Sequence, residues 1–126
     1  MHQYWQDLAT PDFDGIDPES TIALLPLAAV EQHGHHLPLA TDAIINTGLV
    51  NALLQRPQGA ARILVLPAMT IGHSLEHVDY PGTLTIAAET LRQLAYEEHV
   101  LSPQAGWLVY LIIPVTVATV AAVYFG

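Results

Sequence analysis

The sequence of 126 residues contains no cysteine and no lysine, and these two absences exclude several kinds of chemistry. Without cysteine there are no disulfides, no thiolate nucleophile and no zinc–thiolate site. Without lysine there is neither a Schiff-base lysine nor a Walker-type phosphate lysine. Three arginines stand against 12 carboxylates, which excludes the basic surface of a nucleic-acid-binding protein. Chemistry must therefore rest on the carboxylates and on 7 histidines, a set suited to binding metal ions.

The charged side chains are confined to one part of the chain. All of them lie between Asp7 and Glu98, whereas Trp107–Gly126 is a run of 20 residues interrupted only by Pro, Thr and Tyr. We therefore divide the chain into a mixed-pattern domain, residues 1–98, and an apolar tail, residues 99–126. The amino terminus shows no secretory signal, and we expect a cytoplasmic location for the domain.

Apolar runs alternate with helical patterns in residues 1–98. The predicted elements are, in order, a strand over 22–30, a helix over 42–55, a strand over 62–66 and a helix over 87–99. The first helix is expected to be capped by Thr41 or Asp42. Its expected inner face comprises Ile44, Ile45, Leu49, Leu53 and Leu54. This alternation indicates an α/β fold with a mostly parallel sheet and right-handed crossovers.

Ligands of such sheets bind at the carboxyl ends of the strands, where both histidine-rich loops would emerge. In the first loop Glu31 and His33 are two residues apart, so in extended backbone they project to the same side. Gly34 permits a tight turn beside them, and Asp42 returns at the start of the helix. This spacing favours a metal site; the alternative interpretation is a set of solvated loop side chains.

The residues at 31–42, EQHG-x-HLPL-x-TD, resemble the signature of the creatininase (creatinine amidohydrolase) family. The second loop, GHSLEHVDYPGTL at 72–84, resembles that family's second segment. The resemblance implies a three-layer creatininase-like α/β fold and metal-dependent hydrolysis of a C–N amide bond. Substrates in the family are a small cyclic amide, a formamide or a peptide-derived molecule, and complete members form homo-oligomers.

The resemblance also implies roles for particular residues. Glu31 would bind one divalent ion, His33 the other, and Asp42 would bridge a pair of zinc or manganese ions, two per site in the family. The residues implied to contact the substrate or to orient a metal ligand are His36, Glu76 and His77.

The chain departs from the family after the second predicted helix. Family members continue with a strand ending in an Asn-Gly-His segment that supplies further ligands, but here only His99 and no carboxylate follow Glu98. Gly106–Ile113 could imitate that strand, yet Pro114 stands where the ligand loop should begin. We expect an incomplete domain with a core short of a strand, up to one metal ion and weak or no activity alone. The alternative is a non-catalytic, membrane-tethered metal-binding remnant or a partial subunit.

The apolar tail has two interpretations. As a helix, residues 107–126 would span roughly 30 Å, the thickness of the hydrocarbon core of a bilayer. Aromatic residues near both ends suit such a membrane anchor. The richness in Val, Ile and Thr suits instead two buried strands separated at Pro114.

Overall fold

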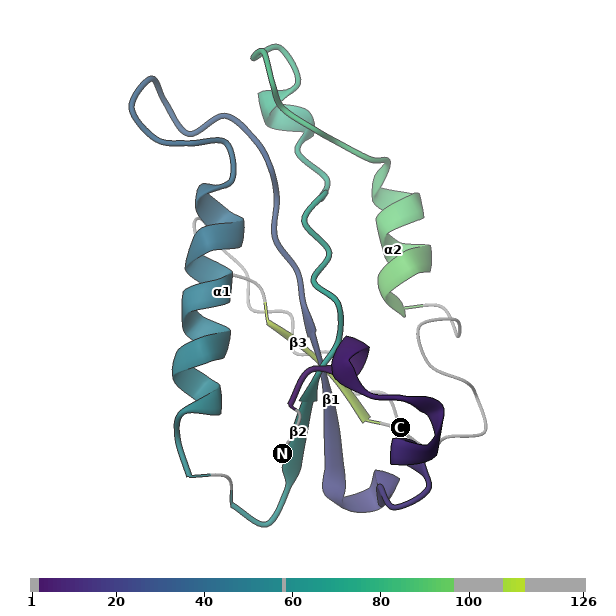
Figure 1. The fold of residues 1–126 in the computed structure, drawn as a ribbon. Helices are drawn as coiled ribbons and strands as arrows, with labels where there is room; N and C mark the ends of the chain where they lie inside the picture. Colours follow the sequence, from purple (N-terminus) through teal and green to yellow (C-terminus); the bar gives the residue numbers. More distant parts are fainter. Residues whose placement is uncertain (1–2, 58, 97–107, 113–126) are drawn as a thin grey trace.

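The computed structural model describes residues 3–57, 59–96 and 108–112, and the strands of this part form one small sheet (Figure 1). The strands are β1 (Thr21–Pro26), β2 (Arg62–Val65) and β3 (Leu108–Ile112). The α-helices are α1 (Thr41–Leu54) and α2 (Ala88–Tyr96). Short 3-10 helices are η1 (Trp5–Asp7), η2 (Thr10–Phe13), η3 (Pro18–Ser20) and η4 (Leu75–His77).

The sheet has the order β2-β1-β3, and both pairings are parallel. In the register, Leu24 of β1 lies opposite Val65 of β2 and Tyr110 of β3. Helices α1 and α2 flank the sheet on opposite sides (Figure 1). Parallel strands are joined by crossover connections, which are usually helices. With one helix on each side, both faces of the sheet are covered. The predicted three-layer α/β fold with a parallel sheet is therefore confirmed.

The core divides between the two faces of β1, because successive side chains of a strand point to opposite sides. One cluster comprises Ala23, Leu25, Leu27 and Leu66, with Trp5 and Met69 packed against it. The other comprises Leu24, Val50 and Val65, with Tyr4, Leu53, Leu54 and Ile63 packed against it. Burial on both faces explains why β1 reads as a continuous apolar run rather than an alternating one.

The expected inner face of α1 is wrong in its first half. Ile44, Ile45 and Leu49 are 60%, 41% and 51% exposed. The buried positions are Asp42, Asn46 and Val50, which repeat every four residues. Asn46 directs the helix this way, because its Nδ2 donates a hydrogen bond of 2.7 Å to the Leu27 carbonyl beyond β1. Apolar residues lie on most sides of this helix, so the hydrophobic pattern does not show which face is buried. The hydrogen bond of Asn46 decides it.

The described part of the apolar tail is a strand. Residues 108–112 form β3 beside β1, so the expectation of a core short of a strand is wrong at this position. Residues of this apolar, partly β-branched kind suit a pleated, buried sheet. A helix over 107–126 is therefore wrong at 108–112, where the alternative of a strand holds. Residues 97–107 and 113–126, on which the rest of the tail prediction depends, lie outside the described residues. Within the described ranges, none of the helices has the length and apolar character needed to cross a bilayer.

Candidate metal centre

Two loops leave the carboxyl edge of the sheet together, one after β1 and one after β2 (Figure 1). Backbone hydrogen bonds join them along their length. Ala28 N–H donates to the Met69 carbonyl at 2.8 Å, and Leu84 N–H donates to the Val30 carbonyl at 2.9 Å. The two loops are therefore hydrogen-bonded to each other at the edge where ligands of parallel sheets bind.

The first loop and the start of α1 bring three metal-ligating side chains together. One ligand atom each of Glu31, His33 and Asp42 lies within 4.8 Å of the others. Asp42 is 5% exposed, and the side chains of Glu31 and His33 are 14% and 13% exposed. Groups of this kind are rarely so buried unless they pair or bind a cation. The three residues that the sequence suggests as metal ligands therefore lie close together in the structure.

A tight reversal brings the ends of the first loop together. Gly34 has φ +76°, a left-handed conformation that a residue with a Cβ rarely adopts. The chain then returns so that Glu31 N–H donates to the Leu39 carbonyl at 3.0 Å. Asp42, three residues further on, is thereby set opposite His33, and its Oδ1 lies 3.2 Å from His33 Nε2.

The ring of His33 is oriented by its other nitrogen. Nδ1 lies 2.9 Å from the Glu31 carbonyl oxygen, and because that oxygen only accepts, Nδ1 carries the proton. Nε2 therefore faces the Asp42 carboxylate either with a second proton or with a free lone pair for a cation. Burial lowers the pKa of His33, but the Glu31 carbonyl and the Asp42 carboxylate raise it more, so that the pKa lies above its ordinary value.

Asp42 is not the cap of α1, and neither is Thr41. The residue before the helix is Ala40, with no side-chain capping bond. The Thr41 hydroxyl donates instead to the Pro38 carbonyl at 2.6 Å, while the Asp42 carboxylate turns toward His33. Asp42 still lies in the first turn of the helix, where the helix dipole favours a negative charge.

The three residues expected beside the ligands have different positions. His77 on η4 lies with its Nε2 3.9 Å from Glu31 Oε1, and its side chain is 31% exposed. Its ring stands 6.3 Å from that of Tyr80. His36 and Glu76 are exposed and do not belong to the group of close ligand atoms found among the described residues. The structure thus brings one of the three, His77, to the candidate centre.

Two further polar residues, Ser74 and Thr83, take part in hydrogen bonds of the second loop, and sequence reasoning missed the first of them. Ser74 is fully buried at the start of η4, and its N–H donates to Thr85 Oγ1 at 3.0 Å. Thr83 Oγ1 accepts from Gln32 N–H at 3.2 Å, between two of the ligands. Proline and glycine at 81–82 are typical of a turn, but that pattern does not show which backbone group Thr83 binds.

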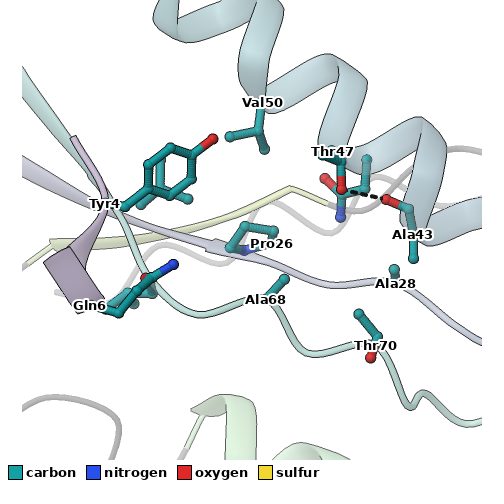
Figure 2. Close-up of a pocket in the computed structure, with 12 residues that line it drawn as sticks. Tyr4, Gln6, Pro26, Ala28, Ala43, Thr47, Val50, Ala68 and Thr70 are labelled. Carbon is teal, nitrogen blue, oxygen red and sulfur yellow. Dashed lines mark hydrogen bonds between the residues drawn. The ribbon is translucent and has the colours of Figure 1, made fainter. Parts of the chain in front are cut away.

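A cavity of about 110 Å³ lies between α1 and the segments that continue β1 and β2 (Figure 2). Its lining includes Ala28, Val50 and Ala68, with Thr47 bonded within the helix to the Ala43 carbonyl at 2.8 Å. None of the three close ligands lines it. The cavity is therefore separate from the candidate metal centre.

The donor set fits a divalent cation. One imidazole nitrogen and two carboxylate oxygens are ligands that Zn²⁺ and Mn²⁺ accept, and catalytic zinc sites use about three protein ligands. The fold and this donor set define an α/β protein with a candidate metal centre at the carboxyl edge of its parallel sheet.

Comparisons with known proteins agree with this class. The family model described as "Creatininase: Creatinine amidohydrolase" matches residues 6–99. The chain is 42% identical over 79 residues to the mycofactocin precursor peptide peptidase of Mycobacterium ulcerans, covering 59% of this chain and 32% of that protein. It is 31% identical over 75 residues to the creatinine amidohydrolase of Pseudomonas putida, covering 56% of this chain and 27% of that protein.

Solved structures show the same fold. A creatininase variant complexed with creatine superposes with a TM-score of 0.74 at 20% identity, covering 90% of this chain and 45% of that one. A creatininase variant of Zn–Zn type superposes with a TM-score of 0.62 at 23% identity, covering 75% and 37%. The chain belongs to the creatininase family. It spans about a third of the length of the mycofactocin precursor peptide peptidases that it matches.

Proposed function

We propose that the chain is a metal-dependent amidohydrolase of the creatininase type, with its cation held by Glu31, His33 and Asp42. The convergence of these three side chains within 4.8 Å carries the proposal. The substrate is a small molecule with a C–N amide bond. A peptide-derived amide is favoured over creatinine or a formamide, because the relatives named as peptide peptidases reach 42% identity and the creatinine amidohydrolase 31%.

The residues around the centre have distinct tasks. A bound divalent cation lowers the pKa of a water molecule and polarises an amide carbonyl. The carboxylates of Glu31 and Asp42 supply negative charge to hold the cation. His33 presents Nε2 because its Nδ1–H is fixed on the Glu31 carbonyl. His77, 3.9 Å from Glu31 and partly exposed, orients that carboxylate or contacts the substrate. His36 and Glu76 lie further out, and we assign them substrate contact only.

The number of cations follows from the number of ligands. Three protein ligands suit one catalytic cation, whereas the pair found in the family requires further donors. We propose that the 126-residue chain binds one zinc or manganese ion and hydrolyses amides weakly. The metal content of purified chain, followed by titration with Zn²⁺ and Mn²⁺, tests this. Two tightly held ions per chain together with metal-dependent amidase activity would contradict the single-cation proposal.

A second candidate function is a non-catalytic metal-binding module or partial subunit. The same ligand count favours it, because one cation with three ligands binds without completing a two-metal site. A panel of creatinine, a formamide and a short peptide amide, each with the metal-loaded chain, separates the two candidates. Hydrolysis that disappears in Asp42→Asn supports the enzyme, and stoichiometric metal binding with no hydrolysis supports the module.

The surroundings of the protein are proposed on the same basis. We propose a cytoplasmic location for residues 1–98 and homo-oligomers like those of complete family members. Size-exclusion chromatography with light scattering measures the oligomeric state, and a monomer at all concentrations would contradict that part of the proposal.

A further inference from the structure

We propose that Thr83 is a positioning residue of the metal centre, acting through a single peptide unit. The inference rests on the proposed metal site. The Thr83 hydroxyl oxygen accepts a hydrogen bond of 3.2 Å from Gln32 N–H. The carbonyl of the same peptide unit, that of Glu31, accepts the hydrogen bond of 2.9 Å from His33 Nδ1–H. Thr83 thus binds the N–H group of the peptide unit between Glu31 and Gln32, and the carbonyl of that unit orients the imidazole of His33.

The effect reaches the ligand atoms in one further step. With Nδ1–H fixed on the Glu31 carbonyl, His33 Nε2 points at Asp42 Oδ1, 3.2 Å away. The peptide unit between Glu31 and Gln32 also lies between two of the proposed ligands in the chain. Glu31 supplies its carbonyl, and His33 directly follows Gln32. A rotation of this peptide plane would therefore turn the ring of His33 and move the backbone that carries Glu31 at once.

Neighbouring backbone bonds hold the chain just before this unit but do not replace Thr83. Leu84 N–H donates to the Val30 carbonyl at 2.9 Å, and Glu31 N–H donates to the Leu39 carbonyl at 3.0 Å. Both involve the peptide unit between Val30 and Glu31, which directly precedes the one between Glu31 and Gln32. They fix the path of the strand extension, and the Thr83 hydroxyl fixes the plane of the next unit.

The turn that precedes Thr83 delivers its hydroxyl to the first loop. Thr83 N–H donates to the Tyr80 carbonyl at 3.3 Å, which closes a reverse turn. Gly82 within that turn has φ +90°, and a Cβ there would lie 2.5 Å from Leu39 Cδ1. The absence of a side chain lets the second loop approach the first closely enough for the bond to Gln32. The Pro-Gly-Thr stretch therefore forms the turn and also positions the Thr83 hydroxyl beside the proposed metal ligands.

The test compares three variants of the full chain by zinc titration. Thr83→Val keeps the branched shape and removes the acceptor, and Thr83→Ser keeps the acceptor. The matched control is Thr85→Val, because Thr85 Oγ1 accepts an equivalent backbone bond from Ser74 N–H at 3.0 Å. Loss of partners that orient metal ligands weakens metal affinity about 10- to 100-fold, and we expect Thr83→Val to lie near the lower end. Thr83→Ser and Thr85→Val should bind close to wild type.

A spectroscopic measurement on the unmutated chain tests the inference even if a variant fails to fold. In the zinc-loaded chain, two-dimensional proton–nitrogen spectra of the histidine rings should show the His33 proton on Nδ1. A proton on Nε2 would overturn the inference whatever the variants do. Equal losses in Thr83→Val and Thr85→Val, wild-type affinity in Thr83→Val, or no rescue by Thr83→Ser would overturn it as well.

The outcomes also separate this inference from the proposed function. An unmutated chain that binds no zinc would refute the metal site and, with it, the role of Thr83. An unmutated chain that binds zinc as strongly as Thr83→Val would leave the metal site standing and refute the role of Thr83 alone.

Discussion

Replacing Asp42 by asparagine tests the metal centre most directly. Asp42 is 5% exposed, and its Oδ1 lies 3.2 Å from His33 Nε2, so its carboxylate is the most buried of the three proposed ligands. Asparagine keeps the shape of the side chain and removes the negative charge. The change therefore alters the affinity for a cation with little disturbance of the packing around α1.

The expected size of the effect follows from the number of ligands. Four-ligand structural zinc sites bind with about 10–16 kcal/mol, or roughly 3 kcal/mol per ligand. At about 1.4 kcal/mol per tenfold change, losing one anionic ligand should weaken zinc binding by on the order of 100-fold. The metal-free chain should keep its stability to within about 1 kcal/mol, because the amide of asparagine can donate a hydrogen bond to the unprotonated Nε2 of a neutral His33, so that no buried charge is left unpaired.

Isothermal titration with Zn²⁺ and thermal unfolding in a chelator measure these two quantities. The matched control is Asp79→Asn, which makes the same change at an exposed carboxylate of the second loop. His35→Ala removes an exposed imidazole from the first loop, and neither control should alter the affinity for zinc. Equal losses of affinity in Asp42→Asn and in either control would refute the assignment of Asp42 as a ligand.

Three further outcomes follow from the structure. The pKa of His33 in the folded, metal-free chain lies above its ordinary value of 6.5. The protonated form of His33 therefore stabilises the fold fully below pH 6.5, and this contribution to the free energy of unfolding is lost as pH rises through the raised pKa. Thermal unfolding in chelator across pH should show this loss, and His33→Asn should remove it. Gly82→Ala should destabilise the chain by about 1–2 kcal/mol, because Gly82 has a positive φ. The control Gly15→Ala should not, because a Cβ at Gly15 would have no heavy atom within 4 Å. Denaturant unfolding measures both changes. Because residues 108–112 pair with β1, the full protein should remain in the aqueous phase of a cloud-point detergent, and its recovery from the detergent-rich phase would show that residues 107–126 anchor the chain instead.

The parallel sheet and its two loops could be predicted from the sequence because they depend on local patterns. Continuous apolar runs mark strands buried on both faces, and the polar stretches after them mark the carboxyl edge. The predicted strand over 62–66 and helix over 42–55 differ from β2 and α1 by about one residue at each end. Boundaries of this kind shift with the hydrogen bonds that end an element, which the sequence does not display.

The orientation of α1 could not be predicted in this way. Its sequence is apolar on most sides, so several rotations bury similar amounts of hydrophobic surface. The choice between them rests on polar groups: Asn46 bonds the Leu27 carbonyl, and Asp42 faces His33. Turning the helix to bury Ile44 or Leu49 would take the Asn46 donor away from the carbonyl of the buried Leu27 and would separate Asp42 from His33. Because a buried carbonyl without a donor is costly, these polar pairs favour the observed orientation.

The sequence by itself determined the family and the parallel α/β fold, and it singled out the three candidate ligand residues, because motif spacing and hydrophobic runs are local properties of the chain. The tertiary structure alone decided which other residues reach the ligands. It brings His77 to Glu31 and Thr83 to Gln32, and it leaves Glu76 exposed. These pairs join two loops that are more than 40 residues apart in the sequence, as the separation of 51 between Gln32 and Thr83 shows. Their contact depends on β1 and β2 lying side by side and ending at one edge, which no single segment encodes.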